Sequence, residues 1–330
     1  MTTLLAVDDL TVSFAARGAP VRAVNGLSLA VETGQSVGVV GESGSGKSVS
    51  ALALLGLLGP TARVERGTAD FEGIDLLRLS RRDLRAIRGR RIGMVFQDPM
   101  SSLNPVLRIG RQIEESLRRH RGMEAAARRA EIAELLGLVG IPDPERIAAC
   151  YPHQLSGGMR QRAMTAMALA CRPSLLIADE PTTALDVTIQ AQVLELLRDL
   201  RRRLGMALML ITHDLGIVAG TTDRVAVMYA GRVVESGPTR TVLADPRHPY
   251  TRGLLASLPR IDAPRTERLR PIRGTPPEPS RLPSGCPFAP RCGERLPRCA
   301  TMPALEAFGD GRAVACWPAQ AAAGIAEERG

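Results

Sequence analysis

Apolar and polar residues follow one another along the chain with two periods, one typical of strands and one typical of helices. Residues 4–31 alternate at every second position, which predicts antiparallel strands joined by a turn near residues 17–20. Four further runs are short and apolar, as buried strands are: residues 35–40, 92–96, 175–178 and 208–212. Helical patterns separate these runs, so the chain predicts an α/β fold with a parallel sheet, closed by a hairpin over residues 225–234.

Two regions depart from this alternation. A helical pattern covers residues 108–139, and with a further helix after residue 156 it predicts a helical subdomain over about residues 98–170. Near residue 245 the composition changes, and residues 259–303 are rich in proline, arginine and cysteine. We predict a main domain over residues 1–245, which includes an antiparallel β subdomain, and an irregular cysteine-rich C-terminal extension over residues 246–330.

One loop carries the chemistry of phosphate binding. Residues 41–48 read Gly-Glu-Ser-Gly-Ser-Gly-Lys-Ser and fit the pattern G-x-x-x-x-G-K-[ST] between a predicted strand and a predicted helix. Lys47 would reach the β and γ oxygens of ATP, and the Ser48 hydroxyl would ligate Mg²⁺. The predicted ATP-binding residues of the loop are Gly41, Ser43, Gly44, Ser45, Gly46, Lys47 and Ser48.

The composition supports this site and weakens a nucleic-acid alternative. Lys47 is the only lysine in a chain with 43 basic residues, which suggests that the site needs a compact ammonium rather than a planar guanidinium. The net charge is +9, but aromatic residues make up only 3%, so we predict no nucleic-acid partner. No apolar run has the length of a membrane span and the first ten residues do not resemble an export signal, so we expect a cytosolic protein.

A second motif supplies carboxylates. Residues 175–180 read Leu-Leu-Ile-Ala-Asp-Glu, a buried strand that carries Asp179 to its carboxyl end, where α/β folds place their ligands. We predict that Asp179 holds the Mg²⁺ shell and that Glu180 polarises the attacking water as general base.

A third motif lies between the other two. Residues 155–161 read Leu-Ser-Gly-Gly-Met-Arg-Gln, and Ser156 is placed to cap a helix whose N-terminal amides can face an anion. With the three motifs in this order, the chain resembles the ABC ATPases, whose signature begins Leu-Ser-Gly-Gly. The resemblance implies that ATP lies between two cassettes. The residues that would contact the ATP held by the second cassette are Leu155, Ser156, Gly157, Gly158 and Gln161.

The same resemblance assigns four further residues. Gln97 would sense Mg²⁺ and the γ-phosphate, and His213 would contact the γ-phosphate as a switch. Asp186 lies in the loop that would cross to the partner cassette, and Phe14 would stack on adenine. A structural role is the alternative for His213 and Phe14.

Residues 97–105, 151–161 and 248–252 resemble the D-type ATPase of oligopeptide and dipeptide importers. The resemblance implies an ATP-hydrolysing subunit at the cytoplasmic face of the cell membrane. Its partners would be a second ATPase subunit, two transmembrane permease subunits and, indirectly, an external substrate-binding protein. The resemblance favours a related chain as the second ATPase subunit, and a homodimer is the alternative. The alternatives are an importer ATPase for another solute such as nickel, a soluble ABC-type ATPase in translation or DNA repair, and a non-hydrolysing metal-binding regulator.

Four of the six cysteines cluster in the tail: Cys286, Cys292, Cys299 and Cys316. Disulfides are uncommon in a cytosolic chain, and a segment with few apolar residues gains folding energy from a bound metal. In similar peptide-importer ATPases four cysteines are read as ligands of a [4Fe–4S] cluster, so the resemblance implies such a cluster here. A structural Zn²⁺ and no metal are the alternatives. We expect the cluster to hold the tail together, well away from the nucleotide.

Overall fold

The computed structural model describes residues 2–16, 18–183, 185–258 and 271–324. The chain forms two compact units. The first unit comprises Met1–Leu4, Val31–Ser36 and Arg78–Ile211, and the second unit comprises Leu5–Ala30, Val37–Leu77 and Thr212–Gly330. Across the part of the chain that is described, no helix is long and apolar enough to cross a membrane.

The second unit contains an antiparallel sheet in the order β2-β1-β4-β5. Fully buried Leu5 lies opposite fully buried Phe71 in the pairing of β1 with β4, so one face of this sheet forms core. The strands predicted from the alternation of residues 4–31 are confirmed, whereas the two strands that complete the sheet were not predicted. The elements are β1 (Thr3–Phe14), β2 (Val21–Glu32), β4 (Ala62–Phe71), β5 (Ile74–Asp75) and the short helix η1 (Leu76–Arg78).

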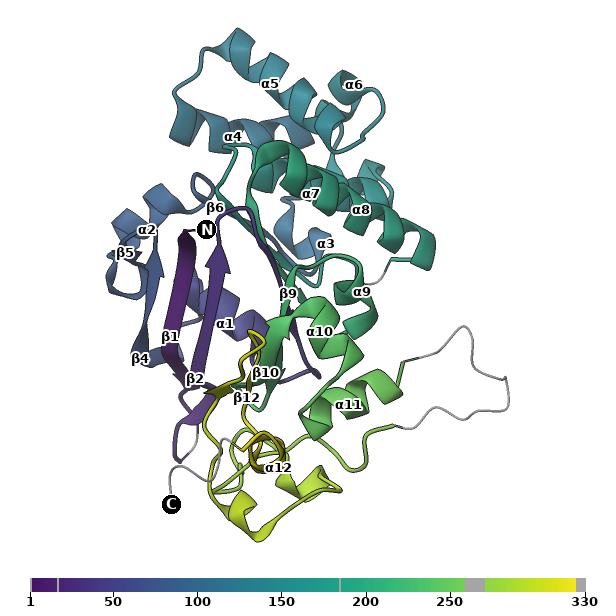
Figure 1. The fold of residues 1–330 in the computed structure, drawn as a ribbon. Coiled ribbons are helices and arrows are strands. Elements are labelled where there is room, and N and C mark those ends of the chain that lie inside the picture. Colours follow the sequence, from purple (N-terminus) through teal and green to yellow (C-terminus); the bar gives the residue numbers. More distant parts are fainter. Residues whose placement is uncertain (1, 17, 184, 259–270, 325–330) are drawn as a thin grey trace. The chain divides into compact units, whose positions relative to one another are not determined.

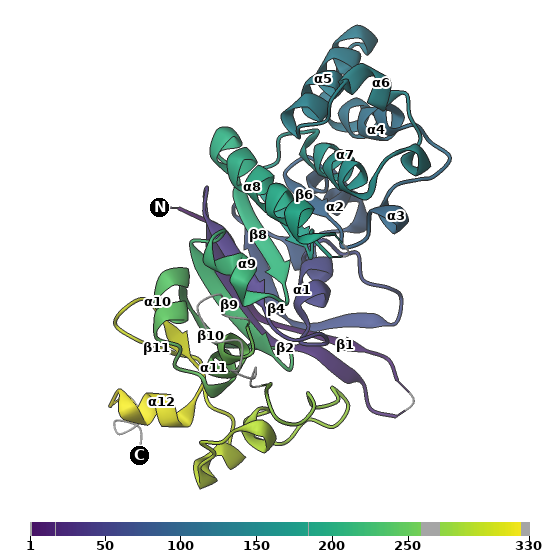
Figure 2. The same cartoon turned by 90° about the vertical axis from the view of Figure 1, so that its right-hand side faces the viewer.

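The second unit also holds β3 (Ser36–Val40), which runs parallel to β9 (Arg224–Tyr229). All five residues of β3 are buried, as expected for a strand covered on both faces. β9 and β10 (Arg232–Pro238) form the predicted hairpin, and the tail adds β12 (Ala313–Val314) to β10 and then β11 (Glu306–Ala307). Figure 2 shows α10 beside β9 and β10. The helices are α1 (Lys47–Leu54), α9 (Leu215–Ala219), α10 (Thr239–Ala244), α11 (Pro249–Ala256), η3 (Ala289–Arg291), η4 (Pro297–Ala300) and α12 (Trp317–Ala322).

The first unit has a parallel sheet in which β7 (Leu175–Asp179) pairs with both β6 (Ile92–Val95) and β8 (Ala207–Thr212). The helical pattern predicted over residues 108–139 is two helices rather than one, because Gly122 adopts a φ of 59° and ends the first of them. Helices α4 to α7 pack together in this unit (Figure 1). The helices are α2 (Arg81–Ile87), α3 (Pro99–Ser102), α4 (Ile109–Arg121), α5 (Ala125–Leu138), α6 (Pro144–Ala148), η2 (Pro152–Gln154), α7 (Gly157–Leu169) and α8 (Val187–Leu204).

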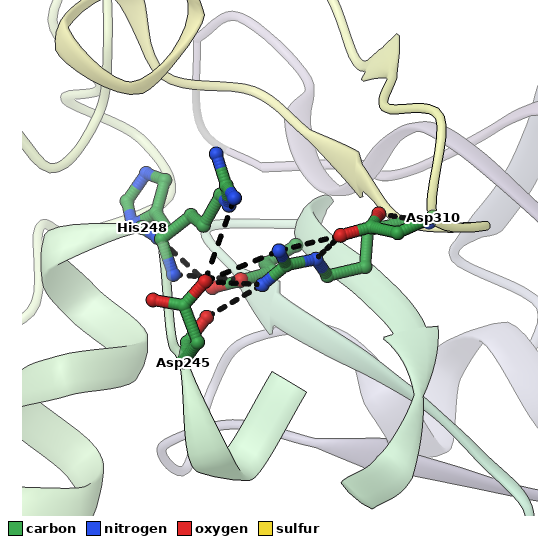
Figure 3. Close-up of polar contacts among 6 residues, drawn as sticks. Asp245, His248 and Asp310 are labelled. Carbon is green, nitrogen blue, oxygen red and sulfur yellow. Dashed lines mark hydrogen bonds and ion pairs between the residues drawn. The ribbon is translucent and has the colours of Figure 1, made fainter. Parts of the chain in front are cut away.

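A polar network around two buried side chains, those of Glu235 and Arg312, holds the tail within the second unit (Figure 3). Glu235 on β10 is fully buried and accepts hydrogen bonds from the backbone N–H groups of Arg247 at 2.8 Å and His248 at 2.9 Å. Arg312, whose side chain is only 3% exposed, pairs with Asp245 at 3.2 Å and donates to Asp310 at 2.6 Å. Buried charges persist where partners satisfy them, so these pairs fix the path of the tail. The domain boundaries stated above, at residue 245 and around the helical subdomain, stay predictions.

Candidate functional site

Two glycines of the loop over residues 41–48, Gly41 and Gly46, are required by its close contacts. A Cβ on Gly41 would lie 2.2 Å from the carbonyl oxygen of Met228, and one on Gly46 would lie 2.4 Å from that of Ala23. Gly44 and Gly46 also have positive φ angles, of 78° and 96°, which glycine adopts without strain. Glycine at these positions therefore lets the loop turn tightly between β3 and α1.

Lys47 is the first residue of α1, and its side chain returns into the loop. It is only 4% exposed, and its ammonium donates to the carbonyl oxygens of Gly41 at 2.6 Å and Glu42 at 3.0 Å. Ser48 is half-buried in the first turn of the same helix. A buried cation beside a glycine-rich turn at a helix N-terminus is a suitable site for a phosphate group.

In the first unit, the end of β7 presents the predicted carboxylates. Asp179 is the last residue of the strand and is 5% exposed. Glu180 follows with a φ of 44°, and its N–H donates to the carbonyl oxygen of Ile211 at 2.8 Å. The Glu180 carboxylate accepts hydrogen bonds from Gln97 at 3.1 Å and Thr183 at 2.9 Å. The structure thus brings together the two predicted residues Gln97 and Glu180, and adds Thr183, which sequence reasoning missed.

The third motif starts α7. Ser156 caps this helix by accepting the N–H of Met159 at 3.3 Å, and both Ser156 and Gly157 are exposed. A Cβ on Gly158 would lie 3.1 Å from Ile189 on α8, so the glycine lets these two helices begin close together. Leu155 and Gln161 are buried, at 3% and 2% exposed.

Three other predicted residues stand at the ends of strands or helices. Asp186 is exposed and caps α8 by accepting the N–H of Ile189 at 2.9 Å, whereas Ala184 of the same loop lies outside the described residues. His213 is exposed and directly follows β8, and Phe14 is half-buried at the end of β1. Their roles stay predictions.

The tail reaches the phosphate loop, which contradicts the expectation that it lies well away from the nucleotide. Arg291 donates two hydrogen bonds to the carboxylate of Glu42, and Tyr250 accepts one from the Glu42 N–H. Sequence reasoning missed all three residues, because Glu42 occupies a position at which the loop pattern accepts any residue. No motif in the sequence distinguished Arg291 from the many other arginines of this chain.

The prediction of an iron–sulfur cluster is wrong. The thiols of Cys286, Cys292, Cys299 and Cys316 do line one small cavity. Even so, no group of three or more His, Cys, Asp or Glu side chains within the described ranges could hold a metal ion. Burial raises the pKa of the Cys286 and Cys292 thiols and raises that of Cys316 to about 12, which favours the protonated form over the thiolate that ligates metals. The same finding leaves the zinc alternative without support.

Comparison with known proteins finds two families that match this chain. The ABC transporter family matches residues 24–183, and the oligopeptide/dipeptide transporter C-terminal region matches residues 234–299. These features define an ATP-hydrolysing cassette of the ABC class. The chain belongs to the oligopeptide/dipeptide family of ABC transporter ATP-binding proteins, as its sequence predicted.

Individual relatives match nearly the whole chain. The oligopeptide transport ATP-binding protein OppD of Salmonella typhimurium is 51% identical over 314 residues, which is 95% of this chain and 93% of that protein. The dipeptide transport ATP-binding protein DppD of Bacillus subtilis is 51% identical over 319 residues, 96% of this chain and 95% of that protein. These relatives are transport proteins and are not described as iron–sulfur proteins, and they give no support to a role in translation or DNA repair.

Solved structures of ATP-binding cassettes have the same fold. One is a dimeric cassette in a post-hydrolysis state bound to ADP and phosphate, with a TM-score of 0.65 and 29% identity. The match covers 72% of this chain and 99% of the solved one. The protein cbiO1 of Clostridium perfringens, part of the ABC transporter complex cbiONQ, matches with a TM-score of 0.63 and 27% identity, over 74% of this chain and 92% of that one.

Proposed function

We propose that Lys47 and the loop amides bind the β- and γ-phosphates of ATP, and that Phe14 stacks on the adenine. The enclosed ammonium of Lys47 supports this role most directly, because it already donates to two loop carbonyls and is pre-organised as a point charge. Gly41, Ser43, Gly44, Ser45 and Gly46 supply the backbone of the phosphate cradle, and Ser48 follows them.

The residues that we propose for Mg²⁺ are Ser48, Gln97 and Asp179. All three offer oxygen, which is the ligand atom that Mg²⁺ prefers, and the Asp179 carboxylate is almost wholly buried at its strand end. The N–H₂ group of Gln97 donates to Glu180, so the amide oxygen is the atom suited to a cation. When bound, the metal would neutralise charge on the phosphates.

We propose Glu180 as the general base that takes a proton from the attacking water. Its carboxylate is held by Gln97 and Thr183, so it needs little reorganisation before reaction. His213, exposed at the end of β8, is our candidate for contact with the γ-phosphate.

The signature residues would act on the ATP of a second ATPase subunit. The exposed, capped start of α7 can face an anion. Asp186 caps the neighbouring helix α8, and Val187, its first residue, is 83% exposed and gives that face an apolar contact for a partner. The dimeric solved cassette supports this arrangement by similarity.

We further propose that the chain energises import of di- or oligopeptides from the inner face of the cell membrane. The names of its relatives support this substrate class. The partners would be a related ATPase subunit, two permease subunits and, indirectly, an external binding protein. The same relatives give no support to a nickel importer, the alternative stated above for the solute.

Reconstitution tests the function. The chain, its co-purified partners and the binding protein are placed in liposomes, and ATP turnover and peptide uptake are measured together. We expect a short peptide to raise both rates, and Lys47→Ala to abolish both. Stimulation by a nickel complex without any response to peptides would reject peptide import while preserving the ATPase assignment.

A further inference from the structure

The phosphate loop is joined to the tail by an ion pair between residues 249 positions apart. Glu42, the second residue of the loop, receives one Nη of Arg291 at 2.7 Å and the other at 3.1 Å. This is the bidentate geometry that matches a guanidinium to a carboxylate, and it is stronger than a single neutral hydrogen bond. Only 5% of the Arg291 side chain is exposed, so solvent screens the pair little.

Arg291 is itself held by an aromatic group that combines Tyr229 of β9 with Phe288 of the tail. Its guanidinium lies 5.8 Å from the ring centre of Tyr229 and 5.9 Å from that of Phe288, and it donates to the Tyr229 hydroxyl at 3.3 Å. Phe288 packs edge-on against Tyr229, with ring centres 5.3 Å apart. The partly buried side chains of Cys286 and Cys292 pack against the same aromatic core. The position of the guanidinium therefore depends on how the tail is folded.

A second contact from outside the loop fixes the Glu42 backbone. The Glu42 N–H donates to the hydroxyl of Tyr250 at 2.8 Å, and the Tyr250 side chain is fully buried. The carbonyl oxygen of Glu42 in turn accepts from the ammonium of Lys47. Glu42 thus links the phosphate-binding lysine to two residues from the C-terminal third of the chain.

The carboxylate of Glu42 belongs to the loop that we propose for phosphate binding, so its charge affects ATP binding. Glu42 borders a recess together with Ser43, Gly44 and Ser45 of the loop. The tail also lines this recess, with Pro276, Pro277, Pro279 and Leu282. An unpaired carboxylate next to a polyphosphate site would repel the ligand, and an arginine that pairs with it removes this repulsion.

We propose that Arg291 is a positioning residue for ATP binding, which holds and neutralises Glu42 so that the phosphate loop is preset for the nucleotide. The tail is then part of the nucleotide-binding machinery of this chain. This inference rests on the assignment of residues 41–48 as the phosphate site made above.

The test compares three variants of the full-length chain by calorimetric titration with MgATP. Arg291→Gln should weaken binding on the order of tenfold, because it leaves a partly buried carboxylate unpaired beside the phosphates. Adding Glu42→Gln should recover most of the loss, since the repelling charge is then gone. Arg252→Gln is the matched control: it breaks a tail ion pair, Arg252 with Glu294 at 2.6 Å, that does not contact the loop, and binding should stay unchanged.

Turnover in the reconstituted transporter separates positioning from general damage. Arg291→Gln should raise the KM for ATP more than it lowers kcat. If Arg291→Gln does not fold, Arg291→Lys keeps the charge but loses the bidentate fork, and it should raise the KM a few-fold. Hydrogen exchange of the loop amides should become faster in either variant.

Two results would overturn the proposal. One is a folded Arg291→Gln or Arg291→Lys protein with the wild-type affinity and KM for ATP. The other is a double variant that binds no better than Arg291→Gln, which would limit Arg291 to a role in tail stability. Lys47→Ala tests separately whether residues 41–48 are the phosphate site. If that variant keeps its affinity for MgATP, the loop is not the phosphate site.

Discussion

The side-chain amide of Gln97 donates a hydrogen bond to the carboxylate of Glu180 at 3.1 Å, although the two residues are 83 positions apart. They meet because β6 and β7 are parallel neighbours, so the segments that follow these strands emerge at the same edge of the sheet. The same oxygen of Glu180 accepts from Thr183 at 2.9 Å. Two donors therefore fix the orientation of the proposed general base.

Glu180→Gln should bind MgATP and hydrolyse it at least about a hundredfold more slowly. The amide keeps the size of the side chain but cannot take a proton from water. Turnover and nucleotide affinity of the variant should be measured with the partner subunit present, where an ATP-bound closed dimer should accumulate. Near-normal turnover would remove Glu180 from the role of base.

Lys47→Arg should abolish ATPase activity even though it keeps the charge. The buried ammonium of Lys47 lies 2.6 Å from the Gly41 carbonyl oxygen inside a tight loop, and a planar guanidinium is too broad for that space. Arg203→Lys, at an exposed position in the last turn of α8, is the control for the reverse exchange and should leave turnover unchanged. Retained activity in Lys47→Arg would show that the loop does not require a compact cation.

Ser156→Arg should block closure of the dimer on the partner's ATP and spare MgATP binding by the isolated chain. The exposed serine caps α7, and a cationic side chain there would fill the space proposed for the γ-phosphate. The lost cap alone costs about 1 kcal/mol. Ser80→Arg is the matched control, because Ser80 caps α2 in the same way by accepting the N–H of Asp83. Loss of MgATP binding by isolated Ser156→Arg protein would indicate misfolding instead of an effect across the dimer.

The stability of the tail should depend on the protonation of His248. Its side chain is 1% exposed, and its Nδ1 accepts the N–H of Tyr250 at 3.0 Å. Burial, and then the charge of Arg252, lower the pKa of His248 from 6.5 to about 3. Below pH 6.5 the unfolded chain therefore binds a proton that the folded chain does not bind until about pH 3. Above pH 6.5, protonation of His248 in the unfolded chain does not lower the free energy of unfolding. Below pH 6.5 it does, and the free energy of unfolding falls by about 1.4 kcal/mol per pH unit as the pH drops towards 4.

Comparison with His248→Asn isolates this effect, because asparagine can also cap a helix but does not titrate. Burial raises the pKa of nearby Glu235 above 4.5, which acts in the opposite direction in both proteins and cancels in the difference. Denaturant unfolding from pH 7.5 to pH 4 should show wild-type stability falling relative to the variant. Parallel pH profiles would contradict the prediction.

The sequence determined the local architecture because its motifs specify backbone geometry. The glycines of the phosphate loop, the capping residue Ser156 and the short apolar strands fold as predicted since their requirements are satisfied within a few residues. The family also follows from these motifs, because their order along the chain is specific.

Tertiary structure decided the contacts that depend on distance through space. Nothing in the sequence distinguished Arg291 or Arg312 from the other arginines, yet the fold buries both and pairs them with Glu42 and Asp245. The cysteines show the reverse case, because their proximity in the sequence suggested a metal cluster. Metal binding needs thiolates, but the fold buries these side chains and so raises the pKa of the Cys286, Cys292 and Cys316 thiols. No group of side chains that could hold a metal ion lies within the described residues.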